Sequence, residues 1–184
     1  MLELIEITIE EFKNKIYEEY TKLFPEDEQR SWKKIKLAYE NGIEKFYKIT
    51  VDETIVGFFM LEKIENHPYY IDYFGIFKNY QNKGYGTKAF EKILSQIANE
   101  DGLYIEIEKE DENDNLTIKR AEFYKRLGFK KTDSEYLLYK VLFTPYIYTK
   151  TEKIEKNEID KIMFDYYKMN CGEDEVKKNC KIIK

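Results

Sequence analysis

The stretch KNYQNKGYGTKAF, residues 78–90, is the most informative part of this sequence. It contains two closely spaced glycines in a chain otherwise rich in bulky residues. Gly84 and Gly86 lie two apart, and Lys83 precedes them. The first amides of a helix have no partners within the helix and carry partial positive charge, and glycines let an anion approach them closely. The pattern therefore fits either a structural turn or a phosphate site, to which Gln81 would add a hydrogen-bonding side chain.

The composition is typical of one globular domain with a short appendage. The chain has 184 residues, 42% of them hydrophobic, which is enough for a sizeable core. Its 17 tyrosines and 12 phenylalanines favour a sheet with aromatic faces. The 31 Lys and Arg residues are outnumbered by 36 Asp and Glu, for a net charge of −5. This balance disfavours nucleic acid as a partner and better tolerates a cationic one.

Cysteine, histidine and apolar runs exclude several other classes of protein. Cys171 and Cys180 are too few for a disulfide scaffold or a four-cysteine zinc site. The one histidine, His67, rules out a histidine-rich metal cluster, and we expect it to be an ordinary surface residue. The longest apolar run, residues 55–61, is too short to span a membrane, and we see no leader peptide. We therefore expect a cytoplasmic protein without a bound metal.

The spacing of apolar residues predicts a mixed α/β or α+β domain. The expected elements are, in chain order, a strand at 2–9, helices at 10–24 and 26–42, strands at 44–51, 54–64 and 69–77, a helix at 87–100, a strand at 103–109, a helix starting at 115 and stopped by Gly128, and a strand at 135–143. We assign residues 1–143 to this domain. Residues 144–184 are expected to form a charged linker and a helix at 158–170 that packs on the same domain.

A second motif makes the glycine stretch more specific. AEFYKRLGF, residues 121–129, follows it after one strand and most of a helix. Together with residues 76–94, this motif resembles the GNAT superfamily of acyl-CoA-dependent N-acetyltransferases. The family's cofactor signature, Q/R-x-x-G-x-G/A, matches Gln81, Gly84 and Gly86.

The resemblance extends from residue 2 to about residue 142 and is greatest to small bacterial members with an additional C-terminal helix. It implies a mostly antiparallel central sheet flanked by helices, with acetyl-CoA bound in an opening between the strands at 69–77 and 103–109. Backbone groups of Phe74 and Ile76 would pair with the pantetheine arm. The diphosphate would lie on the turn formed by Gln81, Asn82, Lys83, Gly84, Tyr85, Gly86 and Thr87.

Acetyl transfer requires a neutral amine and a proton for the departing thiolate. Family members often place the tyrosine that matches Tyr124 beside the cofactor sulfur, so the resemblance implies that Tyr124 is the general acid. Asp72 lies four residues before Ile76, which places both side chains on one face of a strand. The family often has a carboxylate there, and we expect Asp72 to be the base, with Glu106 and Glu108 as rivals.

The chain departs from the family pattern at Ile118, where many members have an asparagine that contacts the cofactor. This difference keeps a second hypothesis open, a non-catalytic acyl-CoA sensor or interaction domain with the same fold. A third hypothesis is an unrelated nucleotide-phosphate binder. The acidic segment at 25–28 fits either the start of a helix or the border of a groove for a cationic acceptor. The sequence leaves open whether the acceptor amine is a small molecule or a peptide, and whether the protein is a monomer or a homodimer.

Overall fold

A computed structural model of the protein describes residues 1–97, 102–149 and 155–183. The fold is mixed α/β, with a mostly antiparallel sheet and, in the described part of the chain, seven α-helices. This confirms the expected fold class. The chain divides into two compact units, the first comprising Met1–Ile64 and Ile71–Ile97, and the second Glu65–Tyr70 and Ala98–Lys184.

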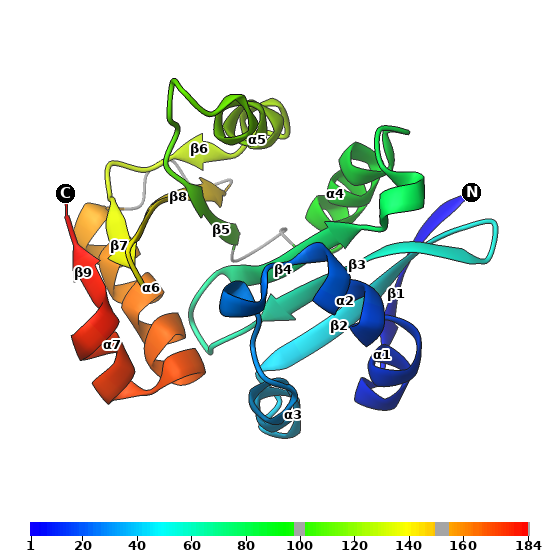
Figure 1. Cartoon of the computed structure of the whole chain (residues 1–184), viewed down its shortest axis with the longest axis horizontal. Coiled ribbons are helices and arrows are strands. Elements are labelled where there is room, and N and C mark those ends of the chain that lie inside the picture. The colour runs from blue at the N-terminus through cyan, green and yellow to red at the C-terminus, as the bar shows by residue number, and fades with distance from the viewer. Residues whose placement is uncertain (98–101, 150–154, 184) are drawn as a thin grey trace. The chain divides into compact units, whose positions relative to one another are not determined.

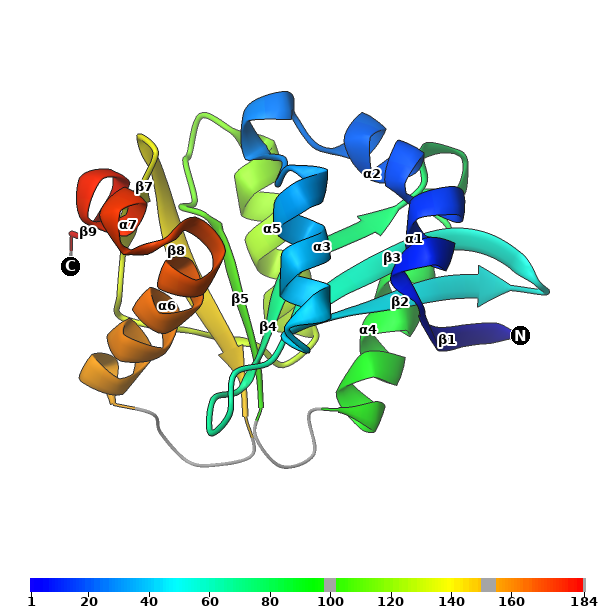
Figure 2. The same cartoon turned by 90° about the horizontal axis from the view of Figure 1, so that it is seen from below.

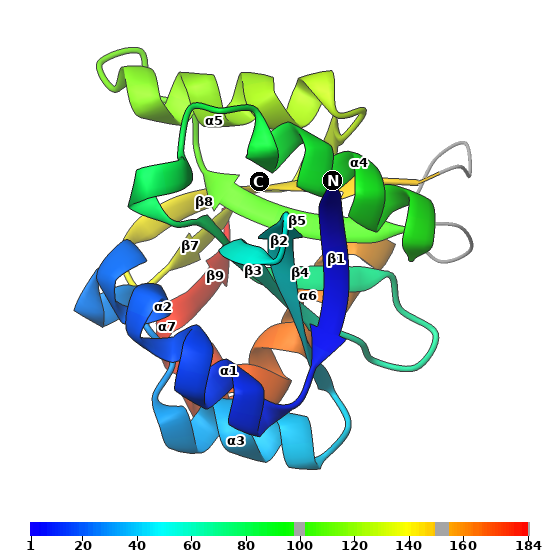
Figure 3. The ribbon, with the colours of Figure 1, turned by 90° about the vertical axis from the view of Figure 1, so that its right-hand side faces the viewer.

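The first unit contains the strand order β1-β2-β3-β4. Its elements are β1 (Leu2–Ile7), α1 (Ile9–Lys15), α2 (Tyr17–Leu23), the 3-10 helix η1 (Glu26–Glu28), α3 (Trp32–Glu40), β2 (Glu44–Val51), β3 (Thr54–Glu62), β4 (Tyr69–Ile76), the 3-10 helix η2 (Lys78–Tyr80) and α4 (Tyr85–Gln96). Strand β2 pairs antiparallel with both β1 and β3. Helices α1 and α3 lie on one side of these strands and α4 on the other (Figures 1 and 3).

Aromatic side chains fill both layers of the first unit. Phe12 of α1 stacks on Phe46 of β2, with ring centroids 4.3 Å apart. Phe90 of α4 meets Phe59 of β3 edge-on at 5.1 Å, whereas the neighbouring Phe58 packs against Phe12 at 6.0 Å. Successive strand residues point to opposite faces, so β3 contributes to both layers. The two layers together fix the strands that precede the glycine turn.

The second unit contains the strand order β5-β8-β7-β9, with β6 also paired to β8. Its elements are β5 (Leu103–Glu108), α5 (Asn115–Arg126), β6 (Lys130–Lys131), β7 (Tyr136–Leu138), β8 (Val141–Tyr148), α6 (Lys156–Cys171), α7 (Glu173–Asn179) and β9 (Cys180–Ile182). Tyr69 and Tyr70, at the start of β4, pair in parallel with Leu103 and Tyr104 of β5. Helices α6 and α7 lie side by side (Figure 2).

Two predicted helices have different limits in the structure. The helix expected at 10–24 is divided into α1 and α2 at the fully buried Ile16, whose φ of −126° is not helical. The helix expected from residue 26 begins only at Trp32. Ser31 caps it, because its hydroxyl accepts a hydrogen bond from the amide of Lys34. The residues just before the cap are thereby left in a non-helical segment.

The prediction of a single strand at 135–143 is wrong. Tyr139 and Lys140 have φ values of 44° and 81° and form a tight turn between β7 and β8. Two successive residues with positive φ usually include glycine or asparagine, and neither is present here, so no local pattern indicates this hairpin. Strand β8 continues to Tyr148, and the predicted boundary at residue 143 therefore falls inside a strand.

The C-terminal segment contains more structure than expected. The predicted helix at 158–170 is present as α6, and the unpredicted α7 and β9 follow it. Residues 150–154 of the expected linker, and residues 98–100 of the helix expected at 87–100, lie outside the described residues. Within the described residues, no helix has the length and apolar composition needed to cross a membrane.

Candidate functional site

The glycine turn exposes the start of helix α4. Gly84 is the N-cap residue, with a φ of 75°, and no side chain caps the helix. The first intrahelical hydrogen bond runs from the amide of Lys88 to the carbonyl of Gly84, at 3.2 Å. The amides of Tyr85, Gly86 and Thr87 therefore have no acceptor within the helix. Asn82 also has a positive φ, of 61°. These amides at the positive end of a helix suit an anionic group.

Two side chains of the turn form hydrogen bonds with the backbone that precedes it. The Gln81 side-chain amide donates to the carbonyl of Ile76 at 2.9 Å. The Lys83 ammonium donates to the carbonyl of Asn79 at 3.0 Å and lies 5.4 Å from the centre of the Tyr80 ring. Both side chains thus tie the turn to the segment that leads out of β4. Lys83 thereby places its ammonium group at this exposed turn.

Strand β4 supplies the other two predicted cofactor residues. The ring of Phe74 stacks on Phe59 at 4.6 Å and meets Phe90 edge-on at 4.7 Å. Ile76 is half-buried at the end of the strand. Beside it, a Cβ added to Gly57 would lie 2.4 Å from the carbonyl oxygen of Gly75, so β3 and β4 approach too closely there for any side chain at that position.

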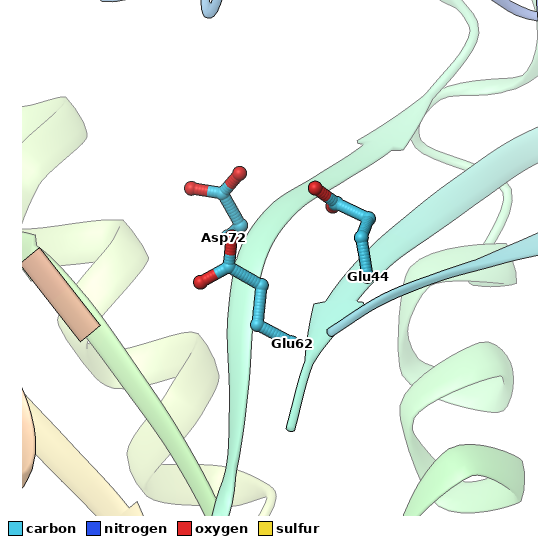
Figure 4. Close-up of side chains that lie close together, drawn as sticks. All are labelled: Glu44, Glu62 and Asp72. Atoms are coloured by element: carbon cyan, nitrogen blue, oxygen red, sulfur yellow. The ribbon is translucent and has the colours of Figure 1, made fainter. Parts of the chain in front are cut away.

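The predicted base Asp72 lies in a buried cluster of charges. The guanidinium nitrogen Nη1 of Arg30 donates to Asp72 at 2.5 Å and to Glu44 and Glu62 at 2.7 Å each. The three carboxylates come from β2, β3 and β4 and converge on one point (Figure 4). This point is occupied by the guanidinium nitrogen. Sequence reasoning identified Asp72 but missed the other three residues, because only the pairing of the strands brings them together.

Burial raises the pKa values of two of these carboxyl groups. Asp72 has a raised pKa because of its burial, although Arg30 partly opposes the shift. The pKa of Glu44 is also raised by burial, and the charges of Glu62 and Asp72 add to the effect. Burial opposes the charge of Arg30, but the three carboxylates outweigh it and raise the pKa of the guanidinium. The cluster can therefore hold a proton in addition to the charge of Arg30.

In the second unit, the predicted acid Tyr124 is buried in helix α5. Only 6% of the residue is exposed, and its ring meets Phe123 and Phe129 edge-on at 5.1 and 5.6 Å. Burial raises the pKa of its phenol, so the group keeps its proton at neutral pH. Ile118, at the position where the family pattern differs, is half-buried on the same helix.

The two rival bases on β5 are both engaged by other side chains. Glu106 accepts hydrogen bonds from the hydroxyls of Tyr70, at 3.0 Å, and Tyr167. Glu108 forms an ion pair with Arg120 at 2.8 Å. Among the three candidates, Asp72 is thus the one that lies in a cluster of carboxylates.

Three other features of the sequence are the acidic segment at 25–28, the single histidine and the two cysteines. The acidic segment at 25–28 includes the 3-10 helix η1. His67 is not an ordinary surface residue, because its side chain is 14% exposed and its Nε2 lies 3.0 Å from Asp165. Neither Cys171 nor Cys180 forms a disulfide, and burial raises the pKa of Cys180 to about 11.

Comparison with known proteins identifies relatives. A sequence model of the Acetyltransferase (GNAT) family matches residues 13–129. An acetyltransferase assigned to the GNAT family from Bacteroides thetaiotaomicron has a TM-score of 0.79 at 19% identity, over 93% of this chain and 99% of that chain. A GNAT family acetyltransferase from Elizabethkingia anophelis, solved with acetyl-CoA bound, has a TM-score of 0.61 at 14% identity, over 80% and 97% of the two chains.

A third similar structure is the ribosomal-protein-alanine N-acetyltransferase from Escherichia coli. Its TM-score is 0.61 at 13% identity, over 85% of this chain and 98% of that chain. Among curated proteins, no sequence matches the chain. Since the matched region runs from helix α1 to just past α5, it contains the glycine turn and both predicted chemical residues.

Proposed function

The chain belongs to the GNAT acetyltransferase family, and we propose that it moves an acetyl group from acetyl-CoA to a primary amine by direct transfer. The observation that carries this proposal is the uncapped start of α4, where three amides have no acceptor within the helix. This feature lies inside the region that matches the family. The acceptor would be a small molecule or a peptide, in keeping with the net charge of −5, which tolerates a cationic partner.

The turn has the properties that a diphosphate requires. A Cβ placed on Gly84 would meet no atom within 4 Å, so the backbone there is open to a ligand. The proposed contacts are the amides from Gln81 to Thr87, with Lys83 adding a positive charge. The pantetheine arm would pair with backbone groups of Phe74 and Ile76. The relative from Elizabethkingia anophelis, which was solved with acetyl-CoA, supports the choice of co-substrate.

The proposed chemistry assigns one proton to each of two side chains. Acetyl-CoA supplies the acetyl group as a thioester. Asp72 would take a proton from the acceptor ammonium, so that the nitrogen lone pair can attack. Tyr124 holds a proton on its phenol oxygen, which it would give to the departing sulfur as the C–S bond breaks. The phenolate left on Tyr124 would recover a proton from the nitrogen, which must lose one more proton to become the amide. Most of the rate enhancement would come from holding the two reactants in position, with acid–base catalysis adding about 10²–10⁴-fold.

Two measurements test this proposal. A ligand at about 100 times its Kd stabilises a protein by roughly 2.7 kcal/mol, so acetyl-CoA should raise the melting temperature and ATP should not. Release of free thiol in the presence of a panel of primary amines then reports turnover. Stabilisation by ATP but not by acetyl-CoA would contradict the proposal and favour an unrelated nucleotide binder.

A non-catalytic acyl-CoA sensor is the second candidate, and Ile118 on α5 is the observation that favours it. This candidate predicts stabilisation by acetyl-CoA without thiol release from any amine. The exchange Ile118→Asn discriminates further, because it restores the family's common residue. Tighter acetyl-CoA binding in this variant would indicate that the native chain has lost a cofactor contact.

A further inference from the structure

The buried charge cluster around Arg30 has an unusual hydrogen-bond geometry. Glu44 and Glu62 are directly opposite each other in the β2–β3 pairing, an arrangement that is destabilising for like charges. Both carboxylates, together with Asp72, approach a single guanidinium nitrogen within 2.7 Å. This nitrogen carries two hydrogen atoms, which are too few to serve three carboxylates. The guanidinium nitrogen cannot itself accept a hydrogen bond, so the deficit is relieved by a proton on one carboxyl group, which that group donates to a neighbouring carboxylate.

The charge balance leads to the same conclusion. Three ionised carboxylates and one guanidinium would leave a net charge of −2 in the interior. The side chains of Glu44 and Glu62 are 0% exposed, and a buried excess of charge is normally removed by protonation. Glu44 also has one oxygen, Oε1, that is buried without a hydrogen-bond partner. The cluster thus has both the charge and a free oxygen to take up a proton.

Arg30 is held in place from several directions. Its amide donates to the hydroxyl of Tyr20 at 2.8 Å, and the hydroxyl of Tyr73 donates to the carbonyl of Glu28 at 2.5 Å. The side-chain amide of Gln29 donates to two carbonyls at the end of α2. These bonds fix the segment just before α3, so Arg30 is an anchored partner of the carboxylates. The anchored guanidinium leaves no place for a metal ion among the same three oxygens.

Only one acidic member of the cluster reaches solvent. The side chain of Asp72 is 10% exposed, and that of Arg30 is 11% exposed, whereas both glutamates are fully covered. Asp72 is therefore the carboxyl group of the cluster that a proton donor outside it can reach. The titratable and charged groups that face Asp72 are Arg30 from the segment before α3, Glu44 from β2, Glu62 from β3, and the phenols of Tyr20 from α2 and Tyr73 from β4.

We infer that Arg30, Glu44, Glu62 and Asp72 form one proton-binding unit, and that this unit, rather than Asp72 alone, accepts the proton of the acceptor amine. This inference rests on the proposed function. In the transfer, the N–H bond of the ammonium breaks, an O–H bond forms on Asp72, and the electron pair stays on nitrogen. Arg30, Glu44 and Glu62 act through Asp72 and are positioning residues.

The test combines variants with opposite expected effects. Glu44→Gln and Glu62→Gln each remove a like charge, so the last cluster carboxyl to ionise should titrate at lower pH than in the native protein. Arg30→Gln removes the opposite charge and should shift this titration to higher pH, whereas Arg30→Lys should restore it in part. Glu3→Gln, on the exposed side of β1, is the matched control and should change nothing.

Two readouts are needed. Carbon-13 NMR of the side-chain carboxyl groups follows the titration without requiring activity. The acid limb of the kcat/KM profile against pH, measured by thiol release, should move in the same direction as the carboxyl titration in each variant. If Arg30→Gln fails to fold, Glu44→Gln and Glu62→Gln still decide the result. These two variants are expected to fold, because the side-chain amide of glutamine closely resembles a protonated carboxyl group in size and shape.

Each outcome bears on a different part of the inference. Carboxyl titrations that are identical in the native protein, Glu44→Gln and Glu62→Gln would overturn the proton-binding unit. If the carboxyl titrations shift in the variants but the acid limb of the kcat/KM profile does not move, another group accepts the proton of the acceptor amine. If acetyl-CoA binds but no amine is acetylated, the proposed function and the acceptor role both fall, while the titrations still decide whether the four residues act as one unit.

Discussion

At the scale of single residues, burial decides what Tyr124 and Asp72 can do. Both side chains are enclosed, and both have raised pKa values, mainly because of burial. A raised pKa makes a carboxylate a better proton acceptor, whereas it makes a phenol a weaker acid. Tyr124 would therefore depend on its position beside the sulfur more than on its acidity.

Replacing Tyr124 with phenylalanine tests this role. The variant keeps the ring that packs against Phe123 and Phe129 but removes the proton, so kcat should fall by about 10²-fold or more. Stabilisation by acetyl-CoA should be unchanged. Thiol-release kinetics measure the rate, and Tyr146→Phe, on another buried tyrosine of the same unit, serves as the control. An unchanged rate in Tyr124→Phe would show that the acid assignment is wrong.

At the scale of elements, the glycine at the start of α4 can be compared with a glycine that follows the end of another helix. Gly84 and Gly42 have nearly the same φ, 75° and 71°, and a Cβ on either would meet no atom within 4 Å. The first lies at the start of a helix and the second follows the end of α3. The two glycines therefore form a matched pair for separating backbone strain from ligand binding.

Alanine at either position should cost about 1–2 kcal/mol of stability, because a left-handed φ is unfavourable for a residue with a Cβ. Only Gly84→Ala should also weaken acetyl-CoA binding, since its methyl group would enter the space proposed for the diphosphate. Chemical denaturation and calorimetric titration measure the two effects. Equal acetyl-CoA affinity in Gly84→Ala and Gly42→Ala would argue against a diphosphate at this turn.

The hairpin between β7 and β8 permits a test of local strain. Lys140 has a φ of 81° in a two-residue turn that normally favours glycine. The exchange Lys140→Gly should therefore stabilise the protein, by about 1 kcal/mol. The midpoint of denaturant unfolding measures this, with Lys130→Gly in β6 expected to be neutral or destabilising. A lower midpoint for Lys140→Gly would mean that the turn is not strained.

At the scale of the whole chain, the dependence of stability on pH involves carboxyl groups whose pKa values are shifted in opposite directions. Glu110 links several elements of the second unit, because it accepts hydrogen bonds from Lys125, Lys131 and Tyr146. Bonding to Lys131 is the main reason that its pKa is lowered to about 2. Asp72 and Glu44 in the first unit have raised pKa values instead.

The sign of the Glu110 contribution to stability follows from its lowered pKa. Glu110 ionises more readily in the folded state, so it stabilises the fold above the ordinary pKa of a glutamate and loses this effect as pH falls toward about 2. Glu110→Gln should therefore be less stable than the native protein at neutral pH, and the difference should vanish in acid. Urea unfolding over a pH series measures it. A difference that is constant across this range would contradict the assignment.

Much of the fold could be predicted, because apolar spacing is a local property of the chain. The strands of the first unit and the helices α4, α5 and α6 all lie where periodicity indicated. The errors arose where tertiary contacts override local pattern, as at the buried Ile16 that divides α1 from α2. The hairpin at Tyr139 was missed because its turn lacks the glycine or asparagine that marks such turns.

The sequence by itself determined the glycine turn, since the spacing of Gly84 and Gly86 before an amphipathic helix leaves the first amides open wherever that helix lies. Only the tertiary structure decided the environment of Asp72. Arg30 reaches it across 42 residues of sequence, and the pairing of β2 with β3 places Glu44 opposite Glu62. Strand register depends on packing over the whole sheet, and no local pattern in the chain specifies which buried charges will meet.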